Sequence, residues 1–165
     1  MKLIDLVLPE FDQEMATTRK LLERVPTDKG EWKPHPKSFS MGHLAQLISM
    51  MPGWITKVIT DTELNVVGGP GYSYEATEAL VASFDRNVRE AREALVAAAE
   101  SDFDVSWSLK AGETVLFTET RRTVLWQTIN HLVHHRGQLS VYLRMVEVPL
   151  PSIYGPTADE PWGKA

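Results

Sequence analysis

The sequence predicts an all-α protein: a four-helix bundle with long connections and a short β-hairpin or extended strap before the last helix. Apolar residues recur every three or four positions in four long segments, which is the period of an amphipathic helix. Stretches rich in proline and glycine separate these segments, and we find neither an internal repeat nor a domain linker. The 165 residues are therefore interpreted as one domain, residues 1–165.

The first helix is expected over about residues 9–25, with Pro9 at its start and Pro26 ending it. Its apolar stripe consists of Leu8, Phe11, Met15, Leu21, Leu22 and Val25. Its charged residues, Glu14 among them, are assigned to the solvent side.

Residues 26–39 are dense in proline, glycine and charge, which is typical of an ordered connection. We expect Trp32 and Phe39 to pin this connection to the core. His35, between two prolines, is interpreted as a surface histidine.

A second helix is expected from the N-cap Ser40 to about Thr60. Pro52 lies inside it and predicts a kink, because proline removes one backbone hydrogen bond. The near-continuous apolar pattern indicates a buried helix that carries His43.

Residues 61–73 contain several glycines and are interpreted as a loop, followed by a third helix over about residues 74–100. Alternation of apolar and polar residues over residues 105–117 then predicts the hairpin or strap. After the last helix, Ile153, Tyr154 and Trp162 are expected to pack the C-terminal tail against the body.

The fourth helix, over about residues 120–146, contains three of the five histidines. Successive helical residues turn by about 100°, so His131 and His135 lie on one face and can chelate one ion. A catalytic zinc typically has three protein ligands and one open position. His43 is the histidine on another helix that can face the core, and His43, His131 and His135 form the predicted metal site.

Plainer interpretations of the same residues remain open. An isolated pair of histidines four residues apart also arises by chance, and a core histidine is often only hydrogen-bonded. His134 is assigned to the rim of the site or to a position behind its ligands. Arg136 and Gln138 either orient a ligand or form surface contacts. Trp54, Trp126 and Tyr142 are assigned to the core.

The composition narrows the function classes. Cysteine is absent, so a metal must be held by nitrogen and oxygen atoms. The net charge of −5 and scattered basic residues argue against nucleic-acid binding. The absence of cysteine also favours a reducing cytoplasm, and neither a signal peptide nor a membrane span is apparent. Di-iron, zincin, P-loop and dinucleotide-binding motifs are missing.

Three stretches together resemble the DinB-like (DinB/YfiT-like) superfamily. They are residues 32–42, with the sequence WKPHPKSFSMG, the motif from His131 to Leu139, and the tail from Ile153 to Pro156. The resemblance spans nearly the whole chain in order. It implies a DinB/YfiT-like four-helix bundle, often dimeric, in which three histidines hold a divalent metal, nickel or zinc.

The resemblance also implies a reaction. Relatives are metal-dependent transferases or isomerases that use low-molecular-weight thiols such as bacillithiol, mycothiol or glutathione. His131 and His135 match the paired ligands of the last helix. The family's second-helix histidine, however, would fall at about Leu47, whereas this chain has His43, one helical turn earlier.

Three outcomes follow from this shift. His43 reaches the metal from the same helix face, a nearby oxygen or water completes a weaker site, or the site has decayed. A shift of one helical turn moves the point at which the side chain leaves the helix by roughly 6 Å. This distance is large compared with a metal–nitrogen bond of about 2 Å.

The leading functional hypothesis is a cytoplasmic, homodimeric, metal-dependent transferase that activates a small thiol, or water in a hydrolase-like variant, for attack on a small-molecule substrate. The alternative hypothesis is a metal-poor, non-catalytic bundle that binds a small ligand or a protein partner. The residues do not identify the substrate, the thiol or the metal.

Overall fold

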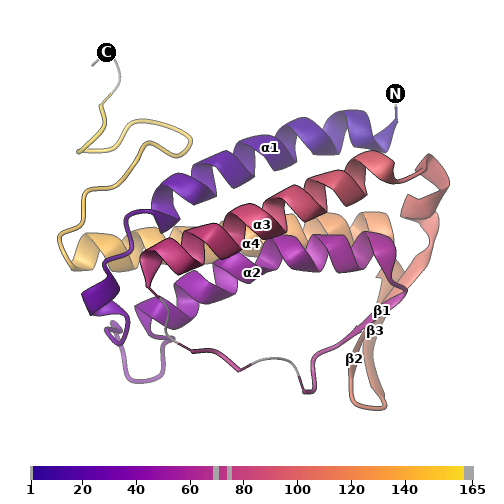
Figure 1. Cartoon of the computed structure of the whole chain (residues 1–165), viewed down its shortest axis with the longest axis horizontal. Helices are drawn as coiled ribbons and strands as arrows, with labels where there is room; N and C mark the ends of the chain where they lie inside the picture. The colour runs from indigo at the N-terminus through magenta and orange to yellow at the C-terminus, as the bar shows by residue number, and fades with distance from the viewer. Residues whose placement is uncertain (1, 69–70, 74–75, 162–165) are drawn as a thin grey trace.

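Four helices pack side by side in the computed structural model, which describes residues 2–68, 71–73 and 76–161. The helices are α1 (Leu3–Leu22), α2 (Met41–Thr60), α3 (Thr77–Ala97) and α4 (Arg121–Met145). They form one elongated bundle, with a small sheet at one end and the C-terminal tail at the other (Figure 1). The predicted four-helix bundle is confirmed.

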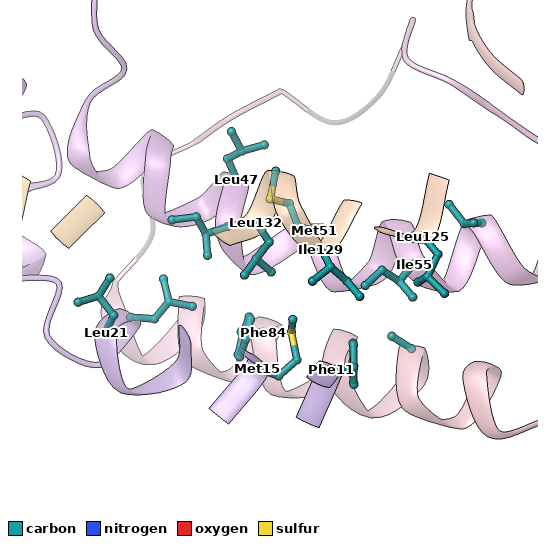
Figure 2. Packing of buried hydrophobic residues seen from close by; sticks show 14 of the residues in the cluster. Phe11, Met15, Leu21, Leu47, Met51, Ile55, Phe84, Leu125, Ile129 and Leu132 are labelled. Atoms are coloured by element: carbon teal, nitrogen blue, oxygen red, sulfur yellow. The ribbon is translucent and has the colours of Figure 1, made fainter. Parts of the chain in front are cut away.

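The core is made from one apolar stripe of each helix. Figure 2 shows Phe11 and Met15 of α1 with Phe84 of α3, opposite Met51 and Ile55 of α2 and residues of α4. The α4 residues labelled there, Leu125, Ile129 and Leu132, are buried. Burying such side chains contributes roughly 1.5–3 kcal/mol each before conformational entropy is subtracted. The apolar residues that recur every three or four positions along each helix therefore form the core of the bundle.

Helix α1 begins at Leu3, earlier than the predicted start at Pro9, so Pro9 lies inside it. Two contacts explain the longer helix. The backbone N–H of Lys2 donates to the Asp5 carboxylate at 2.9 Å, and that of Leu3 donates to the Glu100 carboxylate at 3.0 Å. Both satisfy donors that a helix start leaves free. Val7 is then fully buried, which offsets the hydrogen bond that Pro9 cannot make.

The other helices follow the prediction closely. Ser40 caps α2, its Oγ accepting the N–H of His43 at 3.4 Å, and α2 runs unbroken through Pro52. Helix α4 begins directly after Thr120 and ends at Met145. Helix α3 ends at Ala97; its expected start, Tyr74, lies outside the described residues. Short 3₁₀ helices, Thr27–Lys29 and Glu100–Asp104, lie in the connections.

A three-stranded sheet stands beside the bundle, in the order β1 (Glu63–Asn65), β2 (Ser106–Ala111), β3 (Thr114–Thr120). Strands β2 and β3 form an antiparallel hairpin, which decides between the predicted hairpin and strap. Gly112 turns it with a φ of +62°, a conformation that favours glycine.

Strand β1 falls in the segment that the sequence predicts to be loop, and this prediction is wrong at residues 63–65. It pairs in parallel with β2, Leu64 opposite Leu109. Three residues are too few for an alternation to stand out, and the partner strand is distant in the chain. The sheet positions Trp107, Leu109 and Phe117 beside α2 and α4.

A buried ion pair joins α1 to α4. Nη1 of Arg136 lies 2.5 Å from Oε2 of Glu14, and the two side chains are 2% and 1% exposed. Nη1 also donates to Thr18 Oγ1 at 3.3 Å, and Nη2 donates to the hydroxyl of Tyr154 at 2.5 Å. That hydroxyl in turn donates to Glu14 Oε1 at 2.9 Å. The assignment of Glu14 to the solvent side is therefore wrong.

The C-terminal tail folds back over this pair, as predicted. Asp159 binds Arg144, which lowers the pKa of the Asp159 carboxyl. Glu160 binds Arg24, and its pKa is lowered by the backbone N–H of Ser152 and by Arg24. Trp162, which the sequence also assigned to this docking, lies outside the described residues.

Trp32 and Phe39 were expected to attach residues 26–39 to the core, and only Trp32 does so. Trp32 packs edge-on against Tyr142 of α4, with ring centroids 5.6 Å apart, and adjoins the core. Phe39 instead is 45% exposed and stacks on His43. His35 is exposed, as predicted. None of the helices in the described part of the chain is long and apolar enough to cross a membrane.

Removing the arginine of the buried pair is expected to destabilise the fold strongly. Arg136→Met leaves the Glu14 carboxylate buried without a cation, which costs about 3–5 kcal/mol in the free energy of unfolding. Urea denaturation followed by circular dichroism measures this. The double variant Glu14→Leu/Arg136→Met should recover much of the loss, because both charges are removed together.

The matched control for this prediction is Arg92→Met, since Arg92 pairs with Asp12 on the solvent-exposed surface. This variant should unfold near the urea concentration of the unaltered protein. An Arg136→Met protein no less stable than Arg92→Met would contradict the structural role assigned to the buried pair.

Candidate functional site

Helix α4 brings His131 and His135 into direct contact. Their Nε2 atoms lie 2.9 Å apart, and their ring centroids 4.7 Å. The spacing of four residues in an unbroken helix produces this arrangement. At most one of the two nitrogens can carry the proton of this hydrogen bond, so the other presents a lone pair.

Gln138, one turn further along α4, sets the tautomer of His135. Nδ1 of His135 lies 2.7 Å from Oε1 of Gln138, which is only an acceptor. Nδ1 therefore donates, and Nε2 is left with the lone pair. His135 is 9% exposed, so its ring is held in place by packing as well. Of the two roles that the sequence left open for Gln138, this contact supports orienting a ligand.

His131 lies at the outer end of the pair and is exposed to solvent. Burial of part of its ring lowers its pKa, and the neighbouring His135 and His134 lower it further because positive charges repel. Its ring centroid is 6.1 Å from that of Trp54 on α2. His134 is exposed, with its ring 5.1 Å from His135, which agrees with a place at the rim.

His43 is positioned by the N-terminus of α2. Its ring is stacked between Phe39, at 4.2 Å between centroids, and Tyr72, at 3.9 Å. Burial lowers the pKa of His43, so the neutral ring is favoured. Its Nε2 is buried and has no hydrogen-bond partner among the described residues. Phe39 is also 6.5 Å from His135 by ring centroids, so the two histidines share this neighbour.

The fit of a divalent metal can be tested against this geometry. Two nitrogens bound at about 2.0–2.1 Å lie about 2.9 Å apart at a right angle, as around an octahedral ion, and about 3.3 Å apart at the tetrahedral angle of zinc. The Nε2 atoms of His131 and His135 lie 2.9 Å apart and are joined by a hydrogen bond. The pair can therefore act as two ligands once the proton between these nitrogens is lost. No three His, Cys, Asp or Glu side chains within the described ranges form a group that could hold a metal. The structure thus assembles His131 with His135, and leaves His43 stacked on Phe39.

The position at which the resemblance places a histidine is apolar in this chain. Leu47 is 5% exposed and belongs to the core, as Figure 2 shows. The side chain at position 47 therefore offers a metal neither a carboxylate nor an imidazole. A third protein ligand from α2 would have to be His43, whose unpartnered Nε2 is a free imidazole nitrogen.

Sequence reasoning missed several neighbours of the site. Phe39 was expected to pin the connection to the core, yet its ring is near those of both His43 and His135. Tyr72 stacks on His43 from a loop that has no periodic pattern, so no signal pointed to it. Trp54, assigned to the core, adjoins the core but stands beside His131 as well.

Comparison with solved structures gives the same architecture. A DinB-like protein from Bacillus subtilis matches with a TM-score of 0.71 at 21% sequence identity, covering 90% of this chain and 97% of that one. A DinB-like protein from Bacillus cereus matches with a TM-score of 0.68 at 19% identity, covering 89% and 95%. At such identities these matches show the shared fold. Among curated proteins, none matches this sequence.

The family model described as DinB family matches residues 2–163, nearly the whole chain. The four helices, the hairpin before α4 and the paired histidines on α4 lie within that range. The chain belongs to the DinB family.

Proposed function

We propose that this DinB-family protein is a divalent-metal-dependent transferase that activates a low-molecular-weight thiol, or water, at a histidine site. The contact between the Nε2 atoms of His131 and His135 carries the proposal. His131 and His135 would hold the ion, with His43 as the third ligand. Imidazole nitrogens suit nickel and zinc, and the chain has no cysteine to offer instead.

A bound divalent ion would supply Lewis acidity, which favours the deprotonated form of a thiol or water. The protein's own residues do the positioning. Gln138 holds His135 with its lone pair on Nε2. The lowered pKa values of His43 and His131 favour neutral rings, the form that binds metals. His131 faces solvent on one side, where a small-molecule substrate can approach.

His43 requires a rearrangement in this proposal. Its ring would have to leave the stack between Phe39 and Tyr72 and bring Nε2 toward the pair. The buried nitrogen gains a partner by this movement, which compensates for the lost stacking contacts. Phe39 is the residue that would give way, since it adjoins both His43 and His135.

The wider setting is part of the proposal. We infer a cytoplasmic homodimer that acts on a small molecule and binds neither nucleic acid nor membrane. The net charge of −5 and the absence of cysteine support this setting.

A second function has its own support. Leu47 is buried in the core, and the described residues contain no group of three metal-binding side chains. The bundle can therefore also serve as a metal-poor, non-catalytic protein that binds a small ligand or a protein partner. The two functions differ in one measurable property, the metal content.

Metal content is the first test. Protein purified without an affinity tag or chelator, then supplied with zinc or nickel, is expected to contain about one ion per chain by elemental mass spectrometry. His135→Ala and His131→Ala should each abolish stoichiometric binding, because each variant breaks the facing pair and leaves one of its two imidazoles, with His43 as the only proposed imidazole partner. His35→Ala is the matched control, since His35 is exposed in a loop.

His43→Ala separates the ligand sets. Loss of metal in this variant establishes His43 as the third ligand, whereas retained metal means that water or another oxygen completes the site. Metal-free protein after zinc and nickel addition overturns the transferase proposal in favour of the binding function. When metal is present, His135→Ala should also lose thiol-transfer turnover while keeping its circular dichroism spectrum.

Gln138 provides an independent prediction. Gln138→Leu removes the acceptor that orients His135, so metal affinity should fall about 10–100-fold, the usual effect of losing such a partner. Gln138→Glu keeps an acceptor for Nδ1 and should retain most of the affinity. Competition with a chromophoric chelator measures both. Equal affinity in the unaltered protein and Gln138→Leu would remove the positioning role of Gln138.

A further inference from the structure

A pocket of about 340 Å³ lies between α2, α4 and the sheet. Trp54 of α2, Trp107 and Leu109 of β2 and Phe117 of β3 form much of its wall. It exists because the sheet stands beside the bundle and leaves a space that its apolar side chains do not fill. The volume is near the lower end of the range for small-molecule sites, about 300–1,000 Å³.

The pocket is continuous with the histidine pair along α4. Val124, Thr128 and His131 line it in succession, three or four residues apart on one helix face. His135 follows on the same face and contacts His131 through Nε2. A molecule that fills the pocket therefore has one end at His131, beside the proposed metal ligands.

The walls exclude charge. No Asp, Glu, Lys or Arg occurs among the described residues that line the pocket. The indole N–H of Trp107 already donates to the carbonyl of Lys57 at 3.3 Å, and the hydroxyl of Thr128 donates to that of Val124 at 2.8 Å. Gln127 and His131 are the remaining polar side chains of the lining. A charged group placed inside would lose its hydration without gaining a counter-ion.

We infer that this pocket binds an uncharged, apolar ring system, which forms the non-reacting part of the substrate. Aromatic walls match a planar ring by stacking and edge contacts. The ring's polar substituent lies at His131, next to the site of chemistry. The assignment of this molecule as substrate rests on the proposed function, whereas binding of the ring to the pocket does not.

The test uses two probes with the same ring, 2-naphthalenemethanol and 2-naphthoate, titrated by calorimetry at neutral pH into protein freed of metal with a chelator, because an ion at His131 would itself bind the carboxylate. The uncharged alcohol should bind at least tenfold more tightly than the carboxylate. In the unaltered protein, the indole N–H signals of Trp54 and Trp107 should shift in nuclear magnetic resonance spectra. The signal of Trp32 should stay in place, because Trp32 packs on Tyr142, outside the pocket.

A matched pair of variants localises the binding. Leu109→Trp fills the pocket and should weaken binding of the alcohol tenfold or more. Leu116→Trp places the same bulk on β3 next to Phe117, where alternation along the strand turns it away from the pocket, and should leave the affinity unchanged. Should Leu109→Trp fail to fold, the tryptophan signals of the unaltered protein decide.

The outcomes separate this inference from the proposed function. His135→Ala should lose metal and keep the affinity for 2-naphthalenemethanol. No binding of the alcohol, preference for the carboxylate, or equal weakening by Leu109→Trp and Leu116→Trp overturns the pocket assignment, whatever the metal content is. If the unaltered protein binds the alcohol but takes up neither zinc nor nickel, the pocket assignment is supported and only the metal-dependent transferase is rejected.

Discussion

The buried contact between Arg136 and Glu14 sets how α4 is rotated in the bundle. An arginine that is almost fully buried must keep its partner, because an unpaired charge in the interior is strongly destabilising. Arg136 follows His135 directly, and neighbouring helical positions differ by about 100°. With Arg136 turned toward α1, His131 and His135 are directed to the side of α4 where Phe39 and Trp54 lie. The tail reinforces this setting, since the Tyr154 hydroxyl contacts both charged side chains.

The same rotation creates a site with two parts. A polar part, the His131–His135 contact, adjoins an apolar part, the pocket beneath the sheet. An uncharged ring held in the apolar part places its substituent at the imidazoles, which provides the proximity that group transfer requires. The sheet is small, yet it supplies Trp107, Leu109 and Phe117, and the pocket would not exist without it.

The histidine pair was predictable because its geometry is local. Four residues of regular helix bring His131 to His135 in any fold that keeps the helix intact. His43 is a different case. The sequence put it on the correct helix behind the correct N-cap, but its ring direction depends on Phe39 and on Tyr72 from a loop without a pattern. Glu14 and Arg136 were missed for a related reason: a charged residue is by default assigned to solvent, and only a partner on another helix reverses that.

The sequence by itself determined the helices, the hairpin, the N-cap at Ser40 and the facing pair of histidines on α4. These features follow from periodicity, capping and the spacing of four residues along a helix, and each of those acts over only a few residues. The tertiary structure alone decided that Pro9 lies within α1, that Glu63–Asn65 forms a strand, that Glu14 and Arg136 are buried together, and that His43 stacks beside Phe39. Each of these depends on groups far apart in the chain, whose energies exist only once the helices have packed.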